Sequence, residues 1–140
     1  MKKIHLILLI SFLACTSYAQ EQPTNLTAND VDPRIVEVFA DDLQTLVLND
    51  PHRLRALNQI LFERHEIIEV PYSADEKYPK LSSMPLFKYS NPNLQRDQVF
   101  NKETFNILKY DLQFYAPTDK IYRVDNTDFL IVVHPQTLRK

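Results

Sequence analysis

The sequence predicts an α+β fold, in which an N-terminal helical hairpin packs on a C-terminal antiparallel sheet of three strands, with a fourth strand as an alternative. Two apolar stripes at helical spacing lie in the first half of the chain, and each begins at an Asp-Pro pair. The C-terminal part instead holds β-branched runs separated by turn residues. Because helices and strands are segregated along the chain, α+β is favoured over α/β alternation.

The predicted helices cover residues 33–48 and 51–65. Asp32-Pro33 and Asp50-Pro51 each supply an N-cap side chain followed by proline at the first helical position. The apolar side chains at helical spacing are Val36, Phe39, Ala40, Leu43, Leu46 and Val47 in the first helix, and Leu54, Leu57, Ile60 and Leu61 in the second.

The predicted strands lie mainly after residue 110. Residues 110–115 alternate between apolar and polar side chains, 120–124 follow after a turn, and 128–133 form an apolar run that predicts a strand covered on both faces. Asn126, in the loop before this run, is the candidate for a left-handed backbone conformation. Residues 66–70 are short and apolar at their centre, and they fit either a strand or an extension of the second helix.

The N-terminus has the pattern of an export signal over residues 1–19. Lys2 and Lys3 precede an apolar run, and small side chains precede Gln20, which predicts cleavage after Ala19. The run is shorter than the roughly 20 residues that a membrane span needs. Cys15 allows an alternative, because the residues before it loosely resemble a lipoprotein cleavage motif. Only lipidation at Cys15 would place the protein on a membrane.

Beyond the signal, we expect a flexible leader at residues 20–31 and one domain at residues 32–140. Cleavage removes two of the 16 basic residues and none of the 18 acidic ones, so the net charge changes from −2 to −4. No basic block is present, which argues against nucleic acid as a partner. The chain contains no glycine, which excludes a P-loop, a dinucleotide-binding turn and a G-x-S-x-G nucleophile elbow from this sequence.

Few side chains suggest catalysis. His65 with Glu66 or Glu69 could bind zinc or perform acid–base chemistry, but the spacing lacks the H-E-x-x-H pattern. We therefore assign no catalytic residue, no metal ligand and no cofactor, and keep a small periplasmic enzyme using these residues as an alternative.

Aromatic side chains between four prolines indicate a different role for residues 71–92. This long stretch has no clear periodicity, so it either wraps the core or forms a recognition surface. If it binds a partner, the contact residues are Tyr72, Tyr78, Phe87 and Tyr89. Six tyrosines also allow a peptide or glycan binder as a second alternative: Tyr72, Tyr78, Tyr89, Tyr110, Tyr115 and Tyr122.

Three segments, at residues 85–94, 105–110 and 121–133, resemble small exported proteins of flavobacteria and related Bacteroidota, as does the signal ending in Tyr-Ala-Gln. The resemblance implies an envelope location in that bacterial group and implies no activity or site residue. We therefore expect an exported, non-catalytic protein, periplasmic or secreted unless it is lipid-anchored, that binds another envelope protein.

Overall fold

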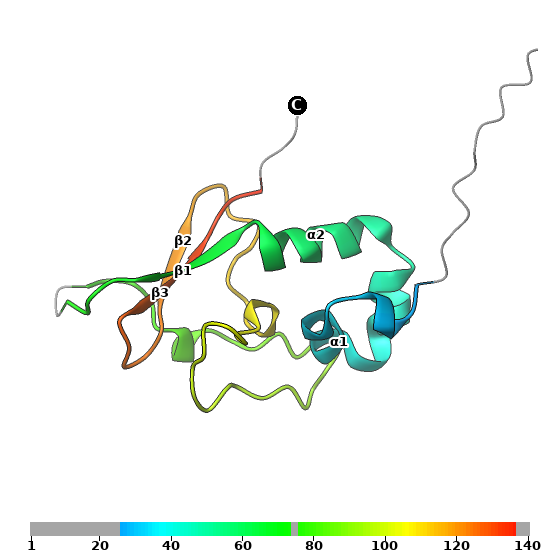
Figure 1. The fold of residues 1–140 in the computed structure, drawn as a ribbon, viewed down its shortest axis with the longest axis horizontal. Coiled ribbons are helices and arrows are strands. Elements are labelled where there is room, and N and C mark those ends of the chain that lie inside the picture. The colour runs from blue at the N-terminus through cyan, green and yellow to red at the C-terminus, as the bar shows by residue number, and fades with distance from the viewer. Residues whose placement is uncertain (1–25, 74–75, 137–140) are drawn as a thin grey trace, which may run out of the picture.

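The computed structural model describes residues 26–73 and 76–136 (Figure 1). The predicted signal at residues 1–19, Cys15 and the first part of the predicted leader lie outside the described residues. Within the described ranges, no helix is long and apolar enough to cross a membrane.

A three-stranded antiparallel sheet and two helices confirm the α+β class at this coarse level. The strands are β1 (His65–Glu69), β2 (Lys120–Arg123) and β3 (Phe129–Val133). Their order is β1-β3-β2, and Ile131 at the centre pairs with Ile67 on one side and Tyr122 on the other. The segment after the second helix is thus a strand and not a helical extension.

The predicted strand at 110–115 is wrong. Tyr110 forms only an isolated antiparallel bridge with Leu86, after a 3-10 turn at Ile107–Lys109. Gln113 adopts a φ of 55°, which is incompatible with extended backbone and ends any pairing there. The third strand of the sheet is supplied instead by β1, from the middle of the chain.

Helices α1 (Pro33–Phe39) and α2 (Pro51–Phe62) begin where the Asp-Pro pairs predict. The Asp32 side chain accepts a hydrogen bond from Arg34 N, and the Asp50 side chain accepts from the backbone at the start of α2, so both predicted N-caps are confirmed.

The first predicted helix is too long, because α1 ends at Phe39. Ala40 has a φ of 43°, and the chain continues as a 3-10 turn at Ala40–Asp42 and a π-helical turn at Gln44–Leu48. The second predicted helix is also slightly too long. The backbone N–H groups of Glu63 and Arg64 both donate to Gln59 O at the end of α2, and the chain then enters β1.

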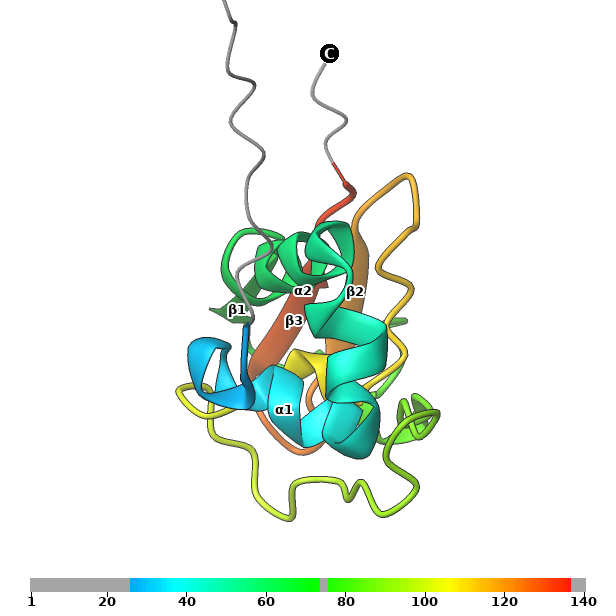
Figure 2. The ribbon, with the colours of Figure 1, turned by 90° about the vertical axis from the view of Figure 1, so that its right-hand side faces the viewer.

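The main core lies between one face of the sheet and the helical part (Figure 2). Ile131, Val133 and Tyr122 contribute from the sheet, and Ile35 and Val38 from α1. Leu130, Ile131, Val132 and Val133 are all buried, which confirms the prediction of a strand covered on both faces. Two further residues on the predicted apolar positions, Leu57 and Phe129, are only partly buried.

Candidate functional site

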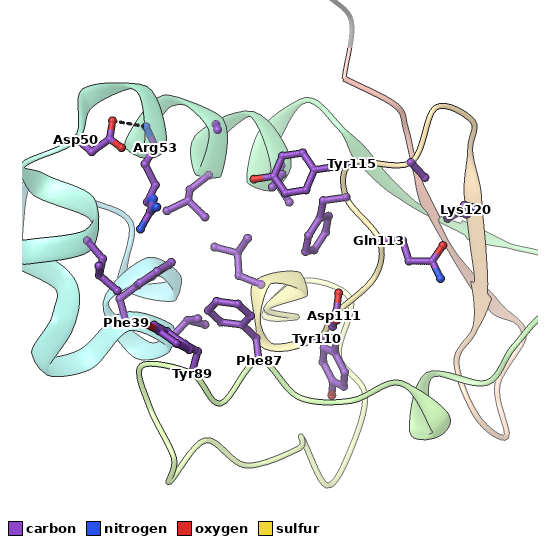
Figure 3. Close-up of a pocket in the computed structure, with 18 of the residues that line it drawn as sticks. Phe39, Asp50, Arg53, Phe87, Tyr89, Tyr110, Asp111, Gln113, Tyr115 and Lys120 are labelled. Atoms are coloured by element: carbon purple, nitrogen blue, oxygen red, sulfur yellow. Dashed lines mark hydrogen bonds between the residues drawn. The ribbon is translucent and has the colours of Figure 1, made fainter.

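A groove of about 990 Å³ opens along one face of α2 and is the candidate site (Figure 3). Ala56, Leu57 and Ile60 form its α2 side. The facing wall comes from two irregular segments, at residues 87–89 and 108–117, which lie far apart in the sequence. The groove is also lined by aromatic, polar and charged residues, among them Phe39, Asp50, Arg53, Phe87, Tyr89, Asp111, Gln113, Phe114, Tyr115 and Lys120.

Main-chain pairing holds Phe87 against the groove. Phe87 N donates to Lys109 O at 2.8 Å, and Asp111 N donates to Pro85 O at 3.0 Å, on either side of the isolated bridge. The Phe87 ring lies 6.0 Å from the ring of Phe39, measured between centroids. These contacts fix the backbone of the wall, although Phe87 belongs to no helix or strand.

Lys109 connects the 108–117 segment of this wall to α1. The residue is buried, and its ammonium lies 2.6 Å from an Asp97 carboxylate oxygen and 3.3 Å from one of Glu37. Burial alone would lower the pKa of Lys109, but the hydrogen bonds and charges of Asp97 and Glu37 outweigh it and raise the pKa. The ammonium therefore stays charged and ties α1 to two loops.

The opposite end of the groove, at residues 113–117, is held by two buried polar side chains. The Tyr122 hydroxyl donates to Leu112 O at 2.8 Å, and burial raises the pKa of this phenol. The Arg64 guanidinium donates to the backbone carbonyls of Phe114 and His134. These bonds hold the loop to β2, to the junction between α2 and β1, and to the residue after β3.

Four charged residues border the apolar lining. Asp50 and Arg53 lie at the α2 N-terminal end, Lys120 lies toward the sheet, and Asp111 lies beside Tyr110 (Figure 3). The Asp50 carboxylate is used by the helix cap, since it accepts from His52 N and Arg53 N. The groove thus has an apolar length with polar ends, an arrangement that suits an amphipathic ligand or segment.

The structure brings together two of the four predicted partner residues. Phe87 and Tyr89 line the groove, and Tyr89 is 81% exposed. Tyr72 and Tyr78 are exposed but do not line it. Tyr72 N donates to the Asp128 carboxylate beside the sheet, and Pro79, next to Tyr78, accepts a hydrogen bond from β2.

Part of residues 71–92 wraps the core, which is one of the two roles that the sequence allows. Leu81 is buried in the core, and Met84 and Leu86 pack against it, so part of the stretch wraps the core. Phe87 and Tyr89 leave their rings at the groove. Because buried and exposed side chains follow one another irregularly in this stretch, its sequence shows no regular hydrophobic period.

The six tyrosines also divide into two groups. Tyr110 and Tyr122 are buried, whereas the others are exposed. The Arg96 guanidinium lies over the Tyr110 ring at 5.5 Å. Of the exposed tyrosines, only Tyr89 and Tyr115 line the groove, so the four exposed tyrosines do not form one surface.

His65 does not meet Glu66 or Glu69 as a catalytic pair. Successive side chains of a strand point to opposite faces, so Glu66 and Glu69 lie on opposite faces of β1. His65 Nδ1 lies 2.7 Å from Ile60 O, and burial lowers the pKa of the imidazole. Glu66 lies instead 3.4 Å from Nε2 of His134, whose Nδ1 is 3.1 Å from Asp119.

Metal-ligating side chains do not gather in the described part of the chain. No group of three or more His, Cys, Asp or Glu residues there lies close enough to hold a metal ion. Asp125 and Asp128 hold loops instead. The Asp125 carboxylate accepts from the Ser82 hydroxyl at 2.6 Å and from Ser82 N at 2.9 Å.

Sequence patterns missed most of the groove. Leu57 and Ile60 lie on the apolar stripe of α2, which predicts core and does not separate core from groove. Phe114 and Tyr115 fall in the segment interpreted as a strand.

Comparison of the chain with protein-family models, with curated proteins and with solved structures finds no match.

Proposed function

We propose that the protein is an exported, non-catalytic protein of the cell envelope, and that its groove binds an amphipathic segment of another envelope protein. The observation that carries this proposal is the apolar groove along α2, to which Phe87 and Tyr89 contribute. An apolar groove with a few polar groups at its ends is the usual form of a binding site. The helical part of the chain, bent between α1 and α2, supplies one wall and the core beneath it.

The exposure of the aromatic side chains supports binding over packing. Tyr89 and Tyr115, on two different segments, are 81% and 76% exposed although both line the groove. A tyrosine has few rotatable bonds, so fixing its ring against a partner costs little conformational entropy, and tyrosine is enriched at interfaces. A partner that covers both rings would therefore gain apolar contact at little cost.

The fixed backbone around these rings supports the same role. Phe87 is held by pairing with Lys109 O, and the facing loop is held by Tyr122 and Arg64. A groove whose walls are already ordered loses little entropy when a partner docks. The exposed side chains are thus presented on a rigid frame.

Capture from the native envelope tests the proposal. The purified protein, carrying a photo-crosslinker on the groove rim, should capture a specific envelope protein. Tyr89→Ala should abolish capture without changing the melting temperature, because the ring is exposed. Tyr72→Ala and Tyr78→Ala are matched controls, since both tyrosines are exposed away from the groove, and they should capture normally. Equal capture by the Tyr89 variant and wild type would remove the groove from consideration.

The envelope location has its own test. Mass spectrometry of the exported form should find Gln20 as the first residue, as expected for cleavage after Ala19. A lipid-modified peptide beginning at Cys15 would instead make the protein membrane-anchored.

A further inference from the structure

The two edges of the sheet differ in how they are covered. On the outer side of β2, Arg123 N donates to Pro79 O at 2.9 Å, and Lys80 forms a parallel bridge with Arg123. Residues 79–80 therefore occupy that edge. The outer side of β1 has no comparable neighbour among the described residues, since the only ladder that includes β1 is the one with β3.

The register identifies which backbone groups of β1 face outward. Val70 N donates to Asp128 O, and His134 N donates to Arg64 O, so the even-numbered residues in between bond to β3. The N–H and C=O groups of His65, Ile67 and Glu69 consequently point away from the sheet. Within the described ranges, no hydrogen bond reaches the backbone of these three residues. Such a row of free groups is a template for another strand.

Two copies of β1, each with the sequence His-Glu-Ile-Ile-Glu, fit side by side when they run antiparallel. In a two-fold antiparallel pair centred on Ile67, His65 of one copy faces Glu69 of the other, and Glu66 faces Ile68. The two Ile67 residues face each other. No like charges are opposed, and each His65 meets a carboxylate, which is the self-complementarity that a two-fold interface needs.

Neighbouring registers fit less well. A shift of two residues toward the N-terminus centres the pair on Glu66 and places the two Glu66 carboxylates opposite each other. The shift in the other direction centres the pair on Ile68 and places His65 opposite Pro71, which has no N–H to donate. The register centred on Ile67 is also the one that overlaps all five residues of β1.

We infer that β1 pairs with β1 of a second copy of this chain, which extends the sheet to six strands across a two-fold axis. The four outward groups of His65 and Glu69 and the two of Ile67 form the new ladder in each copy. This interface lies at the sheet edge and uses none of the groove residues, so it is independent of the proposed function.

Proline at position 67 gives a sharp test by analytical ultracentrifugation of the purified protein. Ile67→Pro removes a donor that faces outward and leaves the ladder with β3 intact, and proline is tolerated at a free edge. We expect wild type to dimerise, and the dissociation constant of Ile67→Pro to rise roughly ten- to hundredfold, since both copies lose a donor. Ile67→Val keeps the donor and should dimerise like wild type.

Amide hydrogen exchange of wild type makes the test independent of any variant. At low concentration the amide of Ile67 should exchange fast and that of Ile68, which bonds to β3, slowly. Raising the concentration should slow Ile67 and leave Ile68 unchanged. The inference is overturned if the protein stays monomeric at every concentration, which includes the case in which this edge binds a different protein. It is also overturned if a dimer forms whose Ile67 amide still exchanges fast.

Discussion

Replacing Ala40 with glycine should stabilise the protein, which is unusual for an alanine-to-glycine change. Ala40 ends α1 with φ 43° and ψ −121°. The Cβ of an L-residue clashes with the backbone in this region, which glycine enters freely. The side chain of Ala40 is exposed, so its removal uncovers little of the core.

The size of the effect follows from two opposing contributions. A non-glycine residue held in such a sparsely populated region costs about 1–3 kcal/mol. Glycine removes that cost but gives the unfolded chain more freedom, which lowers stability by about 0.4–1 kcal/mol. The expected gain is therefore about 1 kcal/mol, or an increase in melting temperature of about 4 °C for a domain of this size.

Urea unfolding measures the change as a shift of the midpoint at constant slope. Ala56→Gly is the matched control, because Ala56 lies inside α2 and its change should destabilise by about 1 kcal/mol. Asn126→Gly is a second control at φ 56°, where asparagine is already tolerated and little should change. If Ala40→Gly lowers stability as much as Ala56→Gly does, the positive φ of Ala40 is not a source of strain.

Two further predictions concern the core and the acid stability. Ile131→Ala should destabilise by about 2–5 kcal/mol, because Ile131 is fully buried at the sheet centre, whereas Leu57→Ala should cost less, since Leu57 is partly exposed at the groove. Equal midpoint shifts in urea would contradict this difference. The Arg123 hydrogen bond lowers the pKa of Glu76 below its ordinary 4.5. The Glu76–Arg123 ion pair should therefore stabilise the fold fully above about pH 4.5 and less as the pH falls through the lowered pKa of Glu76. The Glu76→Gln variant should accordingly lose less free energy of unfolding in acid than wild type does. Parallel pH profiles for the variant and wild type would show that the pair contributes nothing there.

Local chemistry explains the features that the sequence predicts correctly. Asp32 and Asp50 cap α1 and α2 because a carboxylate can reach the free N–H groups of the next turn without help from the rest of the fold. Asn126 takes the left-handed conformation because the loop between β2 and β3 is short and asparagine tolerates it. Each of these outcomes depends on residues within a few positions.

The features that the sequence predicted wrongly or did not predict have a different origin. The alternation at residues 110–115 does mark Tyr110 and Leu112 as buried, and both are. It does not determine where the backbone hydrogen bonds go, and here they go to residues 85–87 and to local turns. A pattern of burial thus resembles a strand even when the chain is irregular. The groove is still less predictable, since it needs α2 and two distant loops to meet.

Backbone conformations that break local rules lie next to the groove. In a chain without glycine, the described residues with positive φ are Ala40, Gln113 and Asn126. Asn126 suits its conformation and lies in the hairpin turn, away from the groove. Ala40 directly follows Phe39, and Gln113 directly precedes Phe114, so both unsuited residues adjoin aromatic side chains of the groove wall.

Departures of this kind persist where the surrounding structure, or a function, requires them. A mere packing gap would give no reason for strain beside two of its lining segments, whereas a binding groove needs Phe39 and Phe114 held at fixed places. The position of the strain therefore favours the groove over the other exposed surfaces as the site of binding. If the groove binds a partner as proposed, relieving the strain at Ala40 should make the protein more stable and should weaken capture of that partner.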